Sequence, residues 1–225
     1  VMTDIHIGGW HMPPERVAHL VETVNGYAPD MVVMPGDFVN GHTAAQETSP
    51  AFQQNLAEGI AHLEQLTAPS YATIGNHDII YGAEVIADAL QGAGVTVLDN
   101  TAAEQLGICL VGLSDAELST PSRGAYGGCA PNVPIVIIAH SADAWPVFRG
   151  DAVLAVTGHT HGGQCKPPFL TPPMLPVKNK AYSAGEVDLE DGRKLYINRA
   201  LGHLWQIRFS VFKRLPFGHR PPNAE

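Results

Sequence analysis

The sequence predicts an α/β protein built as a four-layer α-β-β-α sandwich, in which two mixed sheets are flanked by helices. Over the first two thirds of the 225 residues, short runs rich in Val, Ile, Met or Ala alternate with segments of helical periodicity. In the last third the pattern changes to strands joined by a tight turn, which points to a second sheet. Because we find no internal repeat and no interdomain linker, we expect a single domain over residues 1–225.

Three helices are predicted from apolar side chains that recur three and four residues apart. Pro13 and Pro14 start the first helix, because proline is favoured at the first helical position. The apolar positions are Val17, Leu20, Val21 and Val24 in the first helix, Phe52, Leu56, Ile60, Leu63 and Leu66 in the second, and Val85, Ile86, Ala89 and Leu90 in the third, which covers about residues 82–90. The first two should pack against the sheet, and the third precedes the strand at residues 95–98.

Short apolar runs predict the strands. They lie at residues 31–35, 95–98, 108–113, 133–139 and 152–157, and the first residue is expected inside a strand that leads to Asp4. Residues 181–189 and 193–199, joined across Glu190-Asp191-Gly192, predict a β-hairpin with an Asp-Gly turn. Residues 114–132 are rich in Gly, Ser and Pro and are expected to form a long loop, which in a compact domain is often a binding element.

Five short segments carry side chains that suit metal ions. They are Asp4-Ile5-His6, Gly36-Asp37, Gly75-Asn76-His77-Asp78, Ala139-His140 and Gly158-His159-Thr160-His161. Each follows a short run rich in Val, Ile, Met or Ala, so each is expected at the carboxyl end of a buried strand, where open α/β folds place their ligands. Carboxylate, amide and imidazole donors suit Mn, Fe or Zn. Any one segment alone would be an ordinary turn, but the set predicts a site for two divalent metal ions.

Asp37 is the best candidate to bridge the two ions. It follows the rigid run at residues 31–35, and the small Gly36 leaves room for the turn between them. A carboxylate held at a rigid strand end can reach both metals. The seven candidate ligands are Asp4, His6, Asp37, Asn76, His140, His159 and His161.

The order Asp-x-His, Gly-Asp, Gly-Asn-His-Asp, His and Gly-His-x-His resembles the calcineurin-like metallophosphoesterase family, over residues 1 to about 199. Residues 158–164, 97–100 and 198–202 are similar to a bacterial subgroup that includes exported phosphoesterases and relatives of the UDP-diacylglucosamine hydrolases. The chain departs from the family at Ser-Ala-Asp after His140, where proline is frequent, and at Ala200, where the subgroup usually has glycine. Neither departure affects a candidate ligand.

The resemblance implies a role for each candidate. Asp4, His6 and His161 would bind the first metal, Asn76, His140 and His159 the second, and Asp37 would bridge them. His77 would stand beside the scissile phosphate, and Asp78 would orient it by accepting a hydrogen bond from its ring.

These roles predict phosphoester hydrolysis by a metal-bridging hydroxide. Two cations about 3.5–4 Å apart lower the pKa of a bridging water and bind the phosphoryl oxygens. The leaving alkoxide then needs a proton, and an imidazole has a reference pKa of about 6.5, so His77 is the candidate general acid. The alternative is that His77 only braces its loop.

Charge and composition narrow the partners. The formal net charge of −9 argues against a protein that coats nucleic acid, because that binding needs clustered Lys and Arg. No apolar run approaches the roughly 18 residues of a membrane helix. Cys109, Cys129 and Cys165 form neither a Cys-x-x-Cys motif nor an even framework, and we expect free thiols.

Further side chains bear on the substrate. Trp10, His11 and the proline-rich residues 167–173 either line an apolar cleft mouth or pack the loops against the scaffold. Arg199 either approaches phosphate or forms a surface salt bridge. Residues 208–217 mix basic and large apolar side chains, which either adsorb to an anionic bilayer as a peripheral membrane contact or form a final strand.

The sequence thus predicts a dinuclear metal-dependent phosphodiesterase or pyrophosphatase that acts on a small or lipid-linked phosphate ester. A phosphomonoesterase and a promiscuous metal-hydroxide esterase remain as alternatives. A non-enzymatic scaffold is disfavoured because every expected ligand and His77 are present. The metal, the natural substrate and the oligomeric state are not fixed by the sequence. The location is also open, either cytoplasmic or, in a bacterium, peripheral to the membrane or exported.

Overall fold

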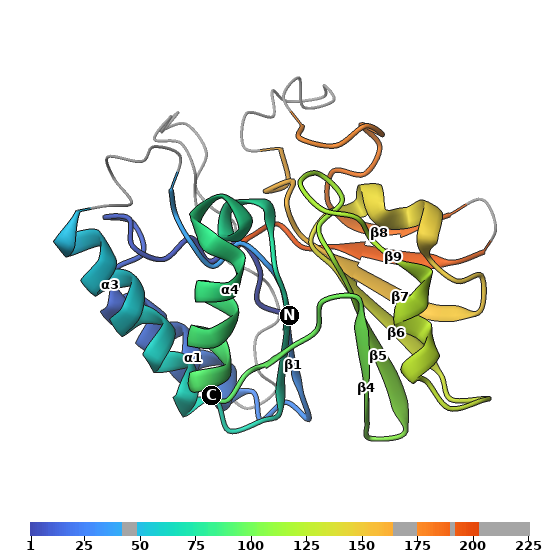
Figure 1. Cartoon of the computed structure of the whole chain (residues 1–225), viewed down its shortest axis with the longest axis horizontal. Helices are drawn as coiled ribbons and strands as arrows, with labels where there is room; N and C mark the ends of the chain where they lie inside the picture. The colour runs from blue at the N-terminus through green and yellow to red at the C-terminus, as the bar shows by residue number, and fades with distance from the viewer. Residues whose placement is uncertain (42–48, 164–174, 190–191, 203–225) are drawn as a thin grey trace, which may run out of the picture.

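The structure is a computed structural model that describes residues 1–41, 49–163, 175–189 and 192–202. The predicted four-layer arrangement is confirmed (Figure 1): three α-helices cover one face of a three-stranded sheet, a six-stranded sheet packs on its other face, and short 3₁₀ helices form the outermost layer. Helices therefore flank both sheets, but among the described residues only the N-terminal layer consists of long α-helices.

The three predicted helices are present. Helix α1 (Pro14–Gly26) has proline at its first position and buries Val17 and Val21. Helix α3 (Pro50–Ala61) starts at Ser49, whose side chain accepts a hydrogen bond from the N–H of Phe52, and it continues as the 3₁₀ helix η1 (His62–Gln65). Helix α4 (Asn76–Gly92) begins six residues before the predicted start, and Gly82 inside it has a non-helical φ of 142°. The periodicity thus located the apolar faces of α1 and α3, but in α4 it missed the helix start, and Val85 of the predicted face is 59% exposed.

The smaller sheet has the order β1-β2-β3, and its described strands are all parallel. Its strands are β1 (Val32–Pro35), β2 (Ser70–Thr73) and β3 (Thr96–Val97). The strand expected before Asp4 is not formed. Residues 2–4 run beside β1 and donate N–H groups from Met2 to Val33 O and from Asp4 to Gly36 O, but Asp4 adopts a φ of 51° that interrupts a regular ladder.

The larger sheet is mixed, with the order β4-β5-β6-β7-β9-β8. Strands β5 (Ile108–Leu113), β6 (Ile135–Ala139), β7 (Ala152–Thr157) and β9 (Lys194–Ile197) are parallel, whereas β4 (Thr101–Gln105) and β8 (Gly185–Asp188) are antiparallel edges. The hairpin of β8 and β9 is confirmed, and residues 190–191 of its predicted turn lie outside the described residues. Strand β4 was not predicted because its sequence, Thr-Ala-Ala-Glu-Gln, contains no run of large apolar residues.

The expected loop at residues 114–132 contains a 3₁₀ helix, η2 (Arg123–Gly128), and a second one, η3 (Ala142–Val147), follows β6. Both lie on the outer face of the larger sheet, where they help to enclose a core that includes Tyr126, Ala142 and Ala144. The loop is thus partly a packing layer.

The prediction of free thiols is wrong for two of the three cysteines. Cys109, near the start of β5, forms a disulfide with Cys129 at the end of η2, with Cα atoms 5.6 Å apart. The 20-residue separation carried no signal, because the sequence did not show that η2 folds back onto β5. Cys165 lies outside the described residues.

The two sheets approach each other closely. The buried cluster between them contains Val33, Tyr71, Leu98, Leu110, Ile138 and Val156. A Cβ atom added to Gly112 of β5 would lie 2.2 Å from the Cβ of Leu98, so a glycine is needed for the sheets to reach this distance. No helix among the described residues is both long enough and apolar enough to cross a bilayer.

Candidate metal centre

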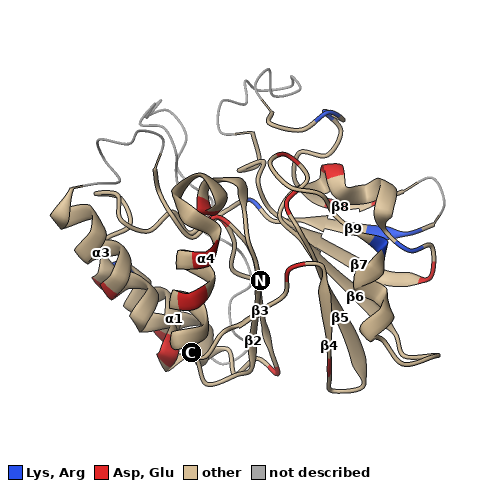
Figure 2. Ribbon diagram, in the orientation of Figure 1, with Lys and Arg blue, Asp and Glu red and all other residues tan. Residues whose placement is uncertain are grey.

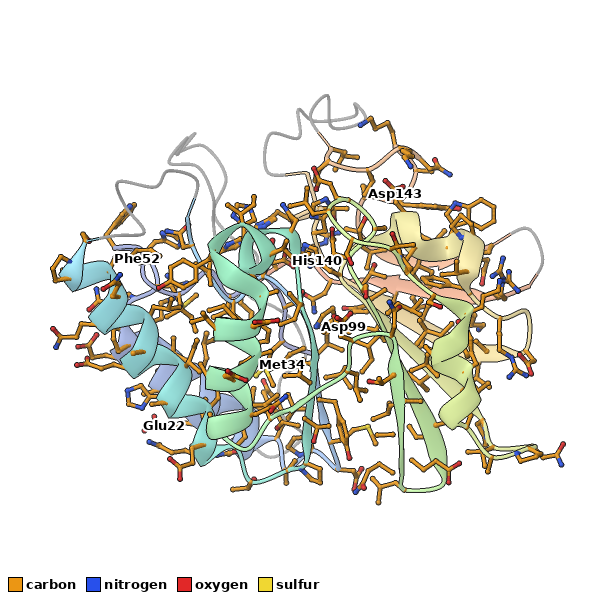
Figure 3. The ribbon with its side chains drawn as sticks, in the orientation of Figure 1. Glu22, Met34, Phe52, Asp99, His140 and Asp143 are labelled. Atoms are coloured by element: carbon orange, nitrogen blue, oxygen red, sulfur yellow. A yellow bond between two sulfur atoms is a disulfide. The ribbon has the colours of Figure 1, made fainter. Side chains whose placement is uncertain are left out.

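The candidate ligands meet where the two sheets adjoin. Asp37 follows β1, His140 follows β6, and His159 and His161 follow β7, all at carboxyl ends of parallel strands as predicted. Figure 3 shows His140 between the two sheets. Asp4 and His6 reach the same place from the segment beside β1, which is bridged at Ile7 to Val39.

The Asn76 segment follows the carboxyl end of the buried strand β2, as predicted. Asn76, His77 and Asp78 also form the first turn of α4, which the sequence did not predict. Gly75 is the N-cap residue, and its N–H donates to the side chain of Asp78 at 2.9 Å. The helix starts here because an acidic residue three positions into a helix satisfies an otherwise unpaired N–H. Asn76 is thereby held rigidly beside the ends of β1 and β6.

The first group of candidate ligands consists of Asp4, His6 and His161. The Nε2 atoms of His6 and His161 are 3.0 Å apart, and His161 Nε2 is 3.4 Å from Asp4 Oδ1. Two imidazole nitrogens that share one metal at 2.0–2.1 Å lie about 2.9–3.4 Å apart in octahedral or tetrahedral geometry. The spacing therefore fits one cation.

The second group contains Asp37, His140 and His159, with Asn76 beside them. His140 Nε2 lies 3.0 Å from Asn76 Oδ1 and 3.0 Å from His159 Nδ1. These donors also converge at the spacing expected around a single ion. The prediction that Asn76, His140 and His159 come together, and that Asp4, His6 and His161 do so separately, agrees with this geometry.

Asp37 lies between the two groups. Its Oδ2 atom is 3.2 Å from His140 Nε2 and 3.8 Å from His6 Nε2, while Oδ1 accepts the backbone N–H of His77 at 3.0 Å. The side chain is buried, so it cannot turn away into solvent. One oxygen of Asp37 therefore faces both groups, as a bridging ligand requires.

The far ring nitrogens of three histidines are held by backbone carbonyls. His6 Nδ1 lies 3.0 Å from Val39 O, His140 Nδ1 lies 2.7 Å from Pro35 O, and His159 Nε2 lies 2.9 Å from Pro176 O. A ring N–H donated to each carbonyl aims the other nitrogen at the cluster, where it can bind a metal ion when it carries no proton. Metal-binding histidines are commonly fixed in this way, so the residues fit a pair of metal ions.

Five of the seven candidate ligands adopt positive φ. The values are 51° for Asp4, 54° for His6, 59° for Asp37, 69° for His159 and 51° for His161. Non-glycine residues seldom occupy this region, and such residues cluster at functional sites. The sharp turns point several side chains from one loop end into a small volume.

Two glycines leave room for the carboxylates. A Cβ atom on Gly75 would lie 2.2 Å from Asp37 Oδ1, and one on Gly158 would lie 2.3 Å from Asp4 Oδ2. The glycine in each motif is therefore required by the carboxylate packed against it.

Burial lowers the pKa values of the histidines, and nearby carboxylates raise them. Burial alone lowers the pKa of His140, but the carboxylates, chiefly Asp37, outweigh it and raise that pKa to about 10. Burial lowers the pKa of His6 to about 3, and burial together with the charge of His140 lowers the pKa of His159 to about 4. In the metal-free protein His140 therefore carries a proton that a metal ion must displace.

The predicted role of Asp78 is wrong in one respect. Its carboxylate oxygens accept four backbone N–H groups, from Asp37, Phe38, Val39 and Gly75, at 2.8–3.0 Å. The ring of His77 instead directs Nδ1 at Gly41 O, 2.8 Å away, and stands edge-on to the ring of His6. Asp78 thus organises the loop that carries Asp37. Burial and the Asp37 charge raise the pKa of Asp78 to about 7.

Around the centre, the sequence missed two acidic residues. Asp115 is buried, and Glu117 lies 3.6 Å from His159 Nε2. Their only sequence signal is a position just after β5, a strand whose carboxyl end adjoins that of β6.

The predicted rim is only partly described. Trp10 is 69% exposed, its ring lies 5.9 Å from that of His11, and residues 167–173 and 208–217 lie outside the described residues. Arg199 packs against the turn at Gly162, next to His161, so it lies near the centre.

Comparisons with known proteins show which family the chain belongs to. The sequence model of the calcineurin-like phosphoesterase family matches residues 1–163. "Phosphodiesterase YaeI" of Escherichia coli (strain K12) is 31% identical over 227 residues, covering 93% of this chain and 76% of the relative. "Uncharacterized metallophosphoesterase YkuE" of Bacillus subtilis (strain 168) is 28% identical over 215 residues, covering 89% and 70%. A "Transmembrane protein with metallophosphoesterase domain" of Danio rerio is 30% identical over 187 residues, covering 74% and 40%.

The chain therefore belongs to the calcineurin-like phosphoesterase family, and the predicted family resemblance is confirmed. Membership supports a metal-dependent phosphoesterase that acts on a phosphate ester. The finer resemblance to UDP-diacylglucosamine hydrolases stays a prediction.

Proposed function

We propose that this member of the family is a phosphodiesterase that holds two divalent cations, Mn, Fe or Zn, in a single domain spanning residues 1–225. The observation that carries the proposal is the position of Asp37, whose Oδ2 atom faces His140 on one side and His6 on the other. A site for one ion has no need of a shared carboxylate. The seven side chains named above would be the ligands.

The chain's own residues orient and protonate the substrate. Bound cations would supply a water of lowered pKa and positive charge for the phosphoryl oxygens. Backbone carbonyls hold His6, His140 and His159 in the required tautomer, and Asp78 fixes the loop of Asp37. His77, fixed through Nδ1 to Gly41 O, would present Nε2 to the leaving-group oxygen and donate its proton there.

The charges near the centre favour diesters. A diester carries one negative charge on its phosphate and a monoester nearly two, so monoester sites usually add cationic side chains. Among the described residues, no Lys or Arg forms an ion pair with Asp4, Asp37 or Glu117. Figure 2 shows several Lys and Arg around the outer ends of β8 and β9 and one basic segment between the two sheets, where acidic segments also lie.

Arg199 is the observation that favours the alternative of a phosphomonoesterase. It packs against the turn that follows His161 and could add positive charge for a dianion. A promiscuous esterase would use the same centre without phosphate selectivity.

An activity panel tests the proposal. The metal-reconstituted protein is assayed with matched aryl monoesters and bis-aryl diesters, together with phosphotriesters and nucleotide-sugar pyrophosphates. We expect the diesters to have the highest kcat/KM. Trp10→Ala should lower kcat/KM only for diesters with a bulky apolar arm, because Trp10 is 69% exposed and follows the first ligand pair, Asp4 and His6, by only a few residues. A monoester preference that Trp10→Ala leaves unchanged would contradict both the diester assignment and the proposal that Trp10 forms an apolar rim of the site.

We also propose that the protein acts in an oxidising compartment, which is the exported alternative. The disulfide between Cys109 and Cys129 supports this, because disulfides persist outside the reducing cytosol. A lipid-linked substrate and a peripheral membrane contact belong to the same proposal. Recovering the native protein from cell fractions and titrating its thiols would test the location, and a cytosolic protein with Cys109 reduced would contradict it.

A further inference from the structure

The loop after β5 brings an acidic side chain to the rim of the second ligand group. Asp115 is buried, and its Oδ2 atom accepts the N–H groups of Glu117 at 2.8 Å and Leu118 at 2.7 Å. These two bonds close a tight turn and fix the backbone of Glu117. The position of the Glu117 side chain therefore follows from a braced turn.

The carboxylate of Glu117 lies outside the proposed ligand shell. Its Oε2 atom is 3.6 Å from Nε2 of His159, the nitrogen that faces away from His140. That nitrogen already has a closer partner in Pro176 O at 2.9 Å, so Glu117 is not required to set the His159 tautomer. The side chain is 53% exposed, whereas that of His159 is 5% exposed. An incoming substrate can therefore meet Glu117 before it reaches His159.

The charge of Glu117 is felt at the second ligand group. Besides the neighbouring Asp115, it interacts electrostatically with His140 and Asp37 of that group and with His77. Among the described residues no Lys or Arg forms an ion pair with Glu117, so no Lys or Arg charge neutralises it.

We propose that Glu117 is a specificity-determining residue that disfavours a second negative charge on the bound phosphate. Its carboxylate repels a monoester dianion more than a diester monoanion. This inference rests on the proposed phosphoesterase function and names a cause for its diester preference. One extra unit charge several Å away in a partly exposed site corresponds to roughly threefold to thirtyfold in binding.

Glu117→Gln tests the proposal because it removes the charge and keeps the side-chain shape. The matched control is Glu22→Gln, since Glu22 is 75% exposed on α1, well away from His140 (Figure 3). For each variant we would measure metal content, the kcat/KM ratio of a matched aryl monoester and diester, and the affinity for inorganic phosphate by calorimetry. We expect Glu117→Gln to raise the monoester-to-diester ratio by roughly threefold to thirtyfold and to bind phosphate more tightly, with a smaller effect at high salt. Glu22→Gln should change none of these.

Two outcomes would overturn the role of Glu117. An unchanged ratio and unchanged phosphate affinity would show that its charge is not felt at the phosphate. Loss of metal in Glu117→Gln would make it a positioning residue for His159 instead. The wild-type ratio tests the diester assignment separately: an intrinsic monoester preference would contradict that assignment, while the change on substitution would still decide the role of Glu117.

Discussion

The two sheets contribute different chemistry to one centre. The smaller sheet, with the N-terminal segment beside β1 and helix α4, carries the three oxygen donors among the candidate ligands and one imidazole. These residues are Asp4, Asp37, Asn76 and His6. The larger sheet supplies three imidazoles, at His140, His159 and His161. Each candidate group of ligands draws on both sheets, so neither sheet could bind an ion alone. Metal binding in this protein should therefore depend on correct docking of the sheets.

The sheets also differ in how they are held. Each has its own buried core, on the side of its helices, whereas the described cluster between the sheets has six buried side chains. The first core rests on three α-helices, and the second is reinforced by a disulfide. In the described parts of the chain, the junction between the sheets has neither, so bound ions should add a cross-link there.

The largest effect should come from Asp37, the residue shared between the groups. Asp37→Ala should release both ions or leave one weakly held, and should lower kcat by more than the roughly hundredfold that outer-shell changes produce. Elemental analysis of the purified variant, together with its turnover, measures this. His6→Ala is the matched comparison, because it should weaken mainly the first ion. Two tightly bound metals and full turnover in Asp37→Ala would show that Asp37 does not bridge.

His77 should separate metal binding from proton transfer. His77→Ala is expected to keep its metals and to lose about 10²–10⁴ in rate on esters with high-pKa leaving groups, with a much smaller loss on activated nitrophenyl esters. The reason is that only a poor leaving group needs the proton. An equal loss on both classes would point to phosphate positioning, and an unchanged rate on both would remove His77 from the mechanism.

Sequence reasoning was most successful where the pattern repeats. Strands β5 and β7 have the predicted bounds, and the apolar faces of α1 and α3 are buried as expected. The candidate ligands also converge in the two expected groups, because the carboxyl ends of parallel strands meet at one edge of a sheet. Short sequence motifs were enough to predict this grouping, because each motif positions its own side chains at a strand end.

The errors involve contacts between distant residues. The sequence could not show that the N–H groups of Phe38 and Val39 donate hydrogen bonds to the carboxylate of Asp78, which is 39–40 residues away. It did not show that Cys129 would return to Cys109, or that Glu117 would face His159. Each depends on how loops fold over the sheets, and loop paths have no periodic signal.

The disulfide should stabilise the larger sheet without affecting the centre. A Cys109→Ser and Cys129→Ser double variant should lose about 3 kcal/mol of unfolding free energy, the chain-entropy value for a loop of this order. Its metal content and kcat should match the wild type, because both cysteines lie outside the two ligand groups. Denaturation and elemental analysis of both proteins measure this. Loss of metal in the double variant would show that the second sheet needs its cross-link to dock correctly.

The smallest effect is a pH dependence of the metal-free protein. Below about pH 6.5, the ordinary histidine pKa, the unfolded chain takes up protons on His6 and His159, whose folded pKa values are about 3 and about 4. Asp78 has a folded pKa of about 7, so its carboxyl group is protonated in the folded state and ionised in the unfolded state. This proton, bound only by the folded state, offsets one of the two protons taken up by the unfolded chain. About one net proton remains, so stability should fall by about 1 kcal/mol per pH unit on acidification from 6.5.

On the alkaline side the sign reverses and one residue dominates. Folded His140 keeps its proton until about pH 10, because Asp37 of the opposite sheet stabilises the charge, while the unfolded chain loses that proton near 6.5. Stability should then fall by about 1 kcal/mol per pH unit as the pH rises above 7.

Chemical denaturation of chelator-treated protein between pH 5 and 9 tests both slopes. The free energy of unfolding should show a maximum near pH 6.5–7, and His140→Gln should abolish its fall on the alkaline side. Metal-loaded protein should lack that fall as well, because an ion replaces the proton in both the ligand set and the junction between the sheets. A metal-free profile that stays flat from pH 7 to 9 would mean that the His140–Asp37 pair does not hold the two sheets together.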